Sequence, residues 1–235
     1  MSGDAVIWHD LECGEYGADL PTWLELAASA GGPILDIGAG TGRVAMALAG
    51  AGHSVTALER DEDLAQELRR RAAGLAVAVI CADACSFSLE ESFALCLVAM
   101  LTVHLFEDRD GFLRSARACM APGGQLAVSV LGGGVDAFEV ELAPDEARHD
   151  GVWYRSYPTA LRQDAAGIEL ERRREVSDDG VVRSQEIERL RLQPLDAARL
   201  RNEAAVHGLE AAGSRRVAAT VEHAANNIVL LRRPA

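Results

Sequence analysis

The sequence predicts an α/β fold: a doubly wound, mostly parallel sheet of seven strands with an inserted three-stranded antiparallel meander. Over residues 33–131, short and almost continuously apolar runs such as FALCLVAML (93–101) alternate with amphipathic helical segments. Such strands are typical of parallel sheets that helices cover on both faces. After residue 131 the runs become longer and partly alternate between apolar and charged residues, which indicates antiparallel strands.

The first half of the chain gives the order of the parallel elements. A helix is expected over 21–30, with Pro21 in its first turn and Gly31 and Gly32 ending it. Apolar runs predict strands at 33–37, 53–59, 75–83, 93–101 and 125–131. The segments between them predict helices at 41–52, at 61–74 with Asp61 as N-cap, and at 108–124, ending in Pro-Gly-Gly.

The second half predicts the insertion and the closing edge of the sheet. Residues 132–152 are irregular and acidic, and strands are expected at 157–164, 167–177 and 181–193 with turns at DAAG and SDDG between them. A helix at 196–208 and strands at 209–217 and 226–234 then complete the sheet. We therefore divide the chain into an amino-terminal helical segment (1–32), a core (33–131 and 194–235) and an inserted β subdomain (132–193).

Composition limits the possible functions. The chain has 235 residues and a net charge of −13, which disfavours binding to a phosphate backbone. It has no apolar run of membrane-spanning length, and its acidic amino terminus does not resemble a signal peptide. The five cysteines show no metal-ligand spacing and read as reduced, small apolar residues. We expect a soluble, cytoplasmic protein without a metal site, nucleic-acid partner or membrane partner.

The stretch ILDIGAGTGR (34–43) places three glycines directly after an apolar strand and before a helix. Backbone N–H groups are exposed at such a turn, which makes it a cradle for a nucleotide-like ligand. The dinucleotide fingerprint G-x-G-x-x-G would require its third glycine at Arg43, but here the third is Gly42. An acid, Asp36, stands two residues before Gly38.

Further residues follow at the ends of the later strands. Glu59 stands nineteen residues after Gly40, Asp83 ends the third strand, and a Pro-Gly-Gly turn precedes the fifth strand. In this order the motifs resemble those of class I S-adenosylmethionine-dependent methyltransferases. The resemblance implies S-adenosylmethionine as cofactor, S-adenosylhomocysteine as product, and methyl transfer to N or O of a small molecule. The implied cofactor-binding residues are Asp36, Gly38, Ala39, Gly40, Gly42, Glu59, Arg60, Asp83, Ala84 and Met100.

The acceptor side has no motif, and its candidates rest on position and chemistry. His104, beyond the fourth strand, and His223, between the last two strands, are candidate general bases, although packing roles are equally open for His104. Aromatic and charged residues before the first strand, at the start of the meander and near the end suggest acceptor contacts, against ordinary packing: Trp8, Tyr16, Trp153, Tyr154, Arg155 and Glu222. The meander either covers the acceptor or pairs two subunits, so the chain is expected to be a monomer or a homodimer.

Two other function classes remain open. A protein that binds S-adenosylmethionine without catalysis, as a scaffold or sensor, would keep the same glycine turn and acids, because a fold does not prove a chemistry. An NAD-dependent oxidoreductase is less favoured, since position 43 is not glycine and the chain contains no lysine for a catalytic Tyr/Lys pair. Similar enzymes that methylate nucleic-acid bases often carry an acid or an Asn-Pro-Pro-Tyr-type sequence at the end of the fourth strand. Here this end, Ala99 to Thr102, is apolar, so the resemblance argues against base methylation.

Overall fold

The computed structural model describes residues 4–220 and 223–235, which form two compact units. The core unit comprises Gly17–Gly133 and Leu195–Ala235, and the insertion unit comprises Met1–Tyr16 and Gly134–Pro194. The amino-terminal segment (1–32) is therefore shared: its part up to Tyr16 groups with the insertion, and its part from Gly17 groups with the core. Across the described ranges, no helix is both long and apolar enough to cross a bilayer.

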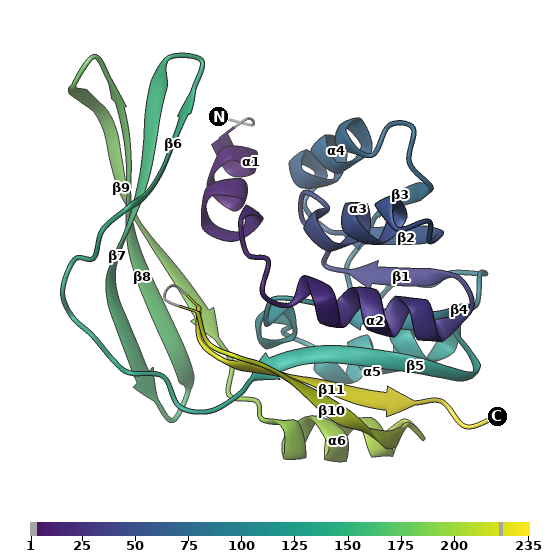
Figure 1. The fold of residues 1–235 in the computed structure, drawn as a ribbon. Helices are drawn as coiled ribbons and strands as arrows, with labels where there is room; N and C mark the ends of the chain where they lie inside the picture. Colours follow the sequence, from purple (N-terminus) through teal and green to yellow (C-terminus); the bar gives the residue numbers. More distant parts are fainter. Residues whose placement is uncertain (1–3, 221–222) are drawn as a thin grey trace. The chain divides into compact units, whose positions relative to one another are not determined.

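The core unit contains a seven-stranded sheet in the order β10-β11-β5-β4-β1-β2-β3 (Figure 1). Its strands are β1 (Ile34–Ile37), β2 (Val55–Glu59), β3 (Val77–Cys81), β4 (Phe93–Val98), β5 (Met120–Leu131), β10 (Glu210–Val217) and β11 (Asn226–Arg232). The strands β1 to β5 pair in parallel, whereas β11 is antiparallel to both β5 and β10. The predicted seven-stranded, mostly parallel sheet is confirmed, including the strand pair at its far edge.

Helices cover both faces of this sheet, and successive strand residues alternate between the two buried clusters. One cluster joins Leu35 and Ile37 of β1 to α5 (Arg109–Cys119) and α6 (Ala197–Val206). The other joins Ile34 to α2 (Leu20–Ala30), α3 (Arg43–Gly50) and α4 (Glu62–Arg71). Because both faces are covered, the strands are apolar throughout, as the sequence indicated.

The largest boundary error in the core unit lies between α5 and β5. The helix expected to run to residue 124 ends at Cys119, and β5 begins at Met120, where it pairs with Phe93 of β4. The Pro-Gly-Gly turn therefore lies inside the start of the strand. Gly123 adopts a φ of 76° and donates to the carbonyl of Arg233 (3.0 Å), so the turn is held by the last residues of the chain.

The insertion unit contains a four-stranded antiparallel sheet in the order β6-β7-β8-β9. Its strands are β6 (Asp145–His149), β7 (Val152–Asp164), β8 (Gly167–Asp178) and β9 (Val181–Leu192). The three meander strands are confirmed, but β6 lies in the segment that we expected to be irregular. A two-residue turn with positive φ at Asp150 (49°) and Gly151 (88°) joins it to β7. The Asp-Gly dipeptide is the usual sequence signal for such a hairpin, so the sequence does carry a local mark of this turn.

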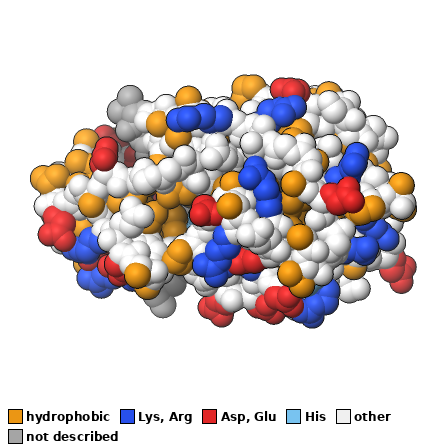
Figure 2. Space-filling view, turned by 90° about the horizontal axis from the view of Figure 1, so that it is seen from below, with side chains coloured by type: hydrophobic (Ala, Val, Ile, Leu, Met, Phe, Trp, Pro, Cys, Tyr) orange, Lys and Arg blue, Asp and Glu red, His pale blue; other side chains and the backbone are white. Residues whose placement is uncertain are grey.

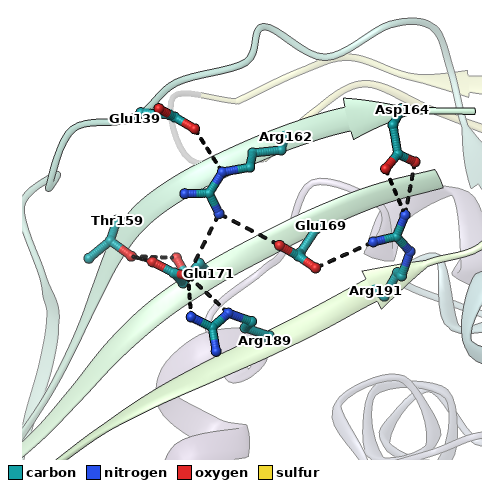
Figure 3. Close-up of polar contacts among 8 residues, drawn as sticks. All are labelled: Glu139, Thr159, Arg162, Asp164, Glu169, Glu171, Arg189 and Arg191. Atoms are coloured by element: carbon teal, nitrogen blue, oxygen red, sulfur yellow. Dashed lines mark hydrogen bonds and ion pairs between the residues drawn. The ribbon is translucent and has the colours of Figure 1, made fainter. Parts of the chain in front are cut away.

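Alternating charges cover one face of this sheet (Figure 3). Glu169 of β8 lies between Arg162 of β7 and Arg191 of β9, at 3.6 and 3.3 Å, and Glu171 accepts from Arg189 at 3.0 Å. Exposed pairs of this kind contribute at most about 1 kcal/mol each. They account for the apolar and charged alternation of the strand sequences.

The amino-terminal segment packs on the sheet of the insertion unit. It consists of α1 (Asp4–His9) and a π-helical turn (Asp10–Gly14). Glu12 accepts two hydrogen bonds from Arg174 (both 2.9 Å) and one from the Ser156 hydroxyl (2.8 Å). The Trp8 ring meets Tyr154 edge-on with centroids 5.2 Å apart. These contacts join segments about 150 residues apart in sequence into one unit.

Replacing Glu12 by alanine should release α1 from the sheet. Burial alone would raise the pKa of Glu12, but the hydrogen bonds and charge of Arg174 lower it overall, so the ionised carboxylate stabilises the folded state. This contribution is present above the ordinary pKa of 4.5 and is lost as the pH falls below it. We expect the free energy of local opening of residues 4–14 to fall by about 1–3 kcal/mol at pH 7. Amide hydrogen exchange, which should become faster over these residues, measures this loss. Exchange should stay unchanged in Glu15→Ala, which alters an exposed acid nearby.

Candidate functional site

The glycine turn after β1 requires glycine at two positions because other side chains lie against it. Gly38, Gly40 and Gly42 have φ values of 75°, 56° and 97°, which L side chains rarely adopt. A Cβ atom on Gly42 would lie 2.0 Å from Leu68 Cδ1, and one on Gly38 would lie 2.6 Å from Thr102 Cγ2. The backbone N–H groups of Gly38 and Ala39 both donate to the carbonyl of Leu58 (2.8 and 3.0 Å), which fixes the turn against β2.

Glu59 joins the end of β2 to the glycine turn. One carboxylate oxygen accepts from the Gly40 N–H (2.8 Å) and the other from the Asp61 N–H (2.9 Å). The side chain is buried. A carboxylate oxygen can accept more than one hydrogen bond, so both oxygens keep capacity for ligand hydroxyls while the backbone holds them in place. The predicted neighbour Arg60 is exposed, and its carbonyl accepts from the Cys81 thiol (3.5 Å).

Asp36 is a buried acid with an unsatisfied oxygen. Its relative exposure is 1%, and Oδ2 has no hydrogen-bond partner among the described residues. Burial raises the pKa of Asp36 to about 7; the Arg43 charge acts in the opposite direction, and Glu59 and Asp19 add to the rise. An orphaned buried carboxylate oxygen is costly. It fits a ligand that brings a positively charged or hydrogen-donating group to this point.

Two residues beside the turn were missed by sequence reasoning. Asp19 forms a bidentate ion pair with Arg43 (2.7 and 3.0 Å) and also accepts from the Trp23 indole N–H (2.8 Å). Asp19 occupies the N-cap position of α2, but its side chain makes no capping hydrogen bond. The partner lies 24 residues away, and the sequence carries no signal for that distance.

The ends of β3 and β4 carry the other predicted cofactor residues. The Asp83 carboxylate accepts from the Cys85 N–H (2.7 Å) and its residue is exposed, while Ala84 is buried. After β4, Met100 and Leu101 have positive φ values of 48° and 61°, an uncommon conformation for such side chains that is often found at functional sites. The 3₁₀ turn Thr102–Leu105 follows, and its Thr102 methyl group is the one that faces Gly38. The ends of β1 and β4 are therefore adjacent.

The two histidines predicted as general bases are both in the core unit. His104 is buried, and its Nε2 accepts a hydrogen bond from the Leu131 N–H (3.2 Å), which ties the 3₁₀ turn to the end of β5. His223 is half-buried, and its backbone N–H donates to the Thr220 hydroxyl (3.0 Å). Glu222 lies outside the described residues. The catalytic roles of both histidines stay predictions.

The remaining acceptor candidates lie in the insertion unit. Trp8 and Tyr154 are in contact, and the Tyr154 hydroxyl donates to Asp4 (3.2 Å); burial and this carboxylate raise the pKa of the phenol. Arg155 lies 5.1 Å from the Trp153 ring centroid and pairs with Glu146 (2.9 Å). Tyr16 is buried. The structure thus gathers these side chains in one unit, and their role toward an acceptor stays a prediction.

The arginine run of the insertion unit is neutralised by ion pairs with acidic side chains. The arginine run at 172–174 is paired with Asp145, Glu141 and Glu12, respectively. Figure 2 shows one face of the molecule, on which arginine and acidic side chains are interspersed. Among the residues that the structure describes, no three histidine, cysteine or acidic side chains are placed to hold a metal ion.

Comparisons with known proteins agree on the fold. Residues 34–124 match the family model described as a methyltransferase domain. The chain is similar in structure to the CcbJ methyltransferase from Streptomyces caelestis, with a TM-score of 0.71 and 23% identity over 100% of this chain and 98% of that one. It is also similar to the sugar N-methyltransferase KedS8 from Streptoalloteichus sp. ATCC 53650, with a TM-score of 0.76 and 16% identity over 98% and 92% of the two chains.

A third similar structure is that of CalS10, an amino pentose methyltransferase from Micromonospora echinaspora, solved with S-adenosylmethionine bound. It has a TM-score of 0.72 and 18% identity over 94% of this chain and 93% of that one. No curated protein matches the chain in sequence. These likenesses confirm the predicted fold along almost the whole chain.

Proposed function

We propose that this chain, whose residues 34–124 match the model of a methyltransferase domain, transfers a methyl group from S-adenosylmethionine to nitrogen or oxygen of a small molecule. The observation that carries the proposal is the glycine turn with its two buried acids. Glu59 is fixed by the Gly40 and Asp61 N–H groups, and Asp36 offers an oxygen without a partner among the described residues. These acceptor oxygens fit a ligand that donates hydrogen bonds from ribose hydroxyls and from a cationic amino acid end.

Each residue would bind the part of the cofactor that suits its chemistry. Glu59 would accept from the ribose hydroxyls, Asp36 would face the cationic end, and Asp83 with Ala84 would hold the adenine. The backbone at Met100 and Leu101, in its uncommon conformation beside the turn, would border the methionine portion. When bound, the cofactor supplies a methyl group already activated on sulfur, so that placing the acceptor in line supplies most of the catalysis.

The class of acceptor is proposed from the names of similar structures. Two of the similar structures are, by their names, an amino pentose methyltransferase and a sugar N-methyltransferase, which makes amine-bearing sugars the first acceptors to test. An amine lone pair can react by placement alone, whereas a hydroxyl group needs a base. His104 and His223 are proposed for that task with an oxygen acceptor, and the insertion unit, with Trp8, Tyr16, Trp153, Tyr154 and Arg155, is proposed to hold the acceptor.

Calorimetric titration tests the cofactor. We expect micromolar binding of S-adenosylmethionine and S-adenosylhomocysteine and no binding of NAD. Glu59→Ala and Asp83→Ala should each lower the affinity about 10- to 100-fold, as expected for a lost hydrogen bond to a charged group. Glu62→Ala serves as the matched control, since it removes an exposed acid three residues beyond Glu59.

Two outcomes would change the proposal. Binding of NAD alone would support the oxidoreductase alternative. Tight binding of S-adenosylmethionine without turnover of any amine or hydroxyl acceptor would support a scaffold or sensor. Methyl transfer to an amino sugar, followed by mass spectrometry of the product, would establish both the activity and the methylated atom.

A further inference from the structure

Buried charged groups lie at the base of the glycine turn, and the acidic ones outnumber the basic one. Asp19 and Asp36 are each 1% exposed and Glu59 is 7% exposed. The guanidinium of Arg43, at the first residue of α3, faces this cluster, and its side chain is 11% exposed. Three buried carboxylates beside one guanidinium leave an excess of negative charge, which is unfavourable in a medium of low polarity.

Arg43 is held in place by Asp19, the residue before α2. Both of its terminal nitrogens donate to the Asp19 carboxylate, at 2.7 and 3.0 Å, in the planar bidentate geometry that restricts an arginine most. Asp19 in turn accepts from the indole of Trp23, which is fully buried. The guanidinium is therefore fixed by the start of α2 while it acts on a residue of β1.

The effect of this fixed charge falls on Asp36. Of the charged groups that act on Asp36, Arg43 favours its ionised form, whereas Glu59 and Asp19, like burial, favour the protonated form. The balance leaves the pKa of Asp36 at about 7, so the acid changes its charge across neutral pH. Its Oδ2 has no hydrogen-bond partner within residues 4–220 and 223–235. A ligand cation at that oxygen would supply the missing charge.

We propose that Arg43, fixed by Asp19, is a positioning residue that keeps Asp36 able to ionise, and that binding of the cofactor's cationic amino acid end releases a proton from Asp36. This inference rests on the proposed function. Arg43 acts on the ligand only through Asp36. The proton passes from the carboxyl group to the buffer, so cofactor affinity is linked to pH.

The experiment compares two ligands by calorimetry between pH 6 and 8. S-adenosylhomocysteine carries the amino acid end, and 5′-methylthioadenosine lacks it. For the unchanged protein, S-adenosylhomocysteine should bind about tenfold more weakly for each pH unit below the midpoint near 7, because one proton is linked to binding. Titration in two buffers of different ionisation heat should show proton release at pH 6. The affinity for 5′-methylthioadenosine should stay level.

Variants then separate positioning from folding. Arg43→Gln should weaken S-adenosylhomocysteine at pH 7 about tenfold and move the midpoint to higher pH, with 5′-methylthioadenosine unaffected. Arg43→Lys should retain most of the affinity because it keeps the charge. Arg109→Gln is the matched control: Arg109 is 10% exposed and pairs with Glu203 (2.9 Å) elsewhere in the core unit, so its loss should leave the midpoint unchanged.

The possible failures are distinct. If the unchanged protein binds S-adenosylhomocysteine equally at all pH values and without proton release, the inference is wrong while the proposed function stands. Equal weakening of both ligands in Arg43→Gln would give Arg43 a general structural role and also overturn it. If neither ligand binds the unchanged protein at any pH, the proposed function itself fails. If Arg43→Gln does not fold, the number of protons released by the unchanged protein and the affinity of Arg43→Lys for S-adenosylhomocysteine still test the inference.

Discussion

Replacement of Gly42 by alanine is expected to destabilise the protein by about 3–5 kcal/mol, through backbone strain and overpacking together. The residue has a φ of 97°, which costs a side-chain-bearing residue about 1–2 kcal/mol. The new Cβ would also lie 2.0 Å from Leu68 Cδ1, which belongs to a fully buried side chain of α4. The leucine cannot move away without disturbing the core cluster between α3 and α4.

Gly52→Ala separates the two causes. Gly52 has nearly the same φ, 93°, but none of the described atoms lies within 4 Å of a Cβ at this position. Its substitution should therefore cost only the backbone strain, about 1–2 kcal/mol. Urea unfolding of both variants measures the difference between their free energies of unfolding. Leu68→Ala combined with Gly42→Ala should cost less than the sum of the two single changes, because the truncated side chain makes room. Equal losses in Gly42→Ala and Gly52→Ala would contradict the proposed close contact.

Replacement of Asp36 by asparagine is expected to stabilise the free protein at pH 8 and to weaken cofactor binding. The folded-state pKa of about 7 is raised above the ordinary value of 3.8. The protonated acid therefore favours folding below pH 4, and this contribution is lost as the pH rises through 7. Three pH units correspond to about 4 kcal/mol as an upper limit. Asparagine does not ionise, so the variant escapes this loss.

Denaturant unfolding at pH 4 and pH 8 checks the stability half of this prediction. The difference between Asp36→Asn and the unchanged protein should be small at pH 4 and should reach up to about 4 kcal/mol in favour of the variant at pH 8. Affinity for S-adenosylhomocysteine at pH 8 should fall about 30-fold, as for a lost charge-assisted hydrogen bond. A stability difference that does not change with pH would show that Asp36 is already ionised at low pH in the folded protein.

Local chemistry explains which parts of the site were predictable. The glycine spacing, Asp36 and Glu59 stand out because a tight turn after a strand restricts which residues can occupy it. In the structure Gly38 and Gly42 meet neighbouring side chains and Glu59 holds the turn, while the cofactor contacts of these residues stay predictions. The helix at Asp61 begins as expected, with the Asp61 carboxylate accepting from the Asp63 and Leu64 N–H groups.

The misses share a different cause. The Asp19–Arg43 pair depends on the packing of α2 beside α3, which no local pattern records. The grouping of the amino terminus with the antiparallel sheet depends on Glu12 meeting Arg174, 162 positions away. The early start of β5 depends on its pairing with β4 and on the carboxyl-terminal Arg233. In each case a residue's role was decided by a distant partner, and single-sequence patterns describe near neighbours.

The composition of the insertion unit from two separate stretches of chain has a consequence for protein engineering. Residues 134–194 look like a cassette that a designer would exchange between related chains to test the acceptor role proposed for it. Such a graft would leave the recipient's own amino-terminal helix against a foreign sheet. In this chain Glu12 binds Arg174 and Ser156, and Trp8 and Asp4 contact Tyr154. The graft would lack these contacts. A chimera that transfers both stretches, with junctions at residues 16, 134 and 194, keeps these contacts together. The exchangeable module is therefore discontinuous.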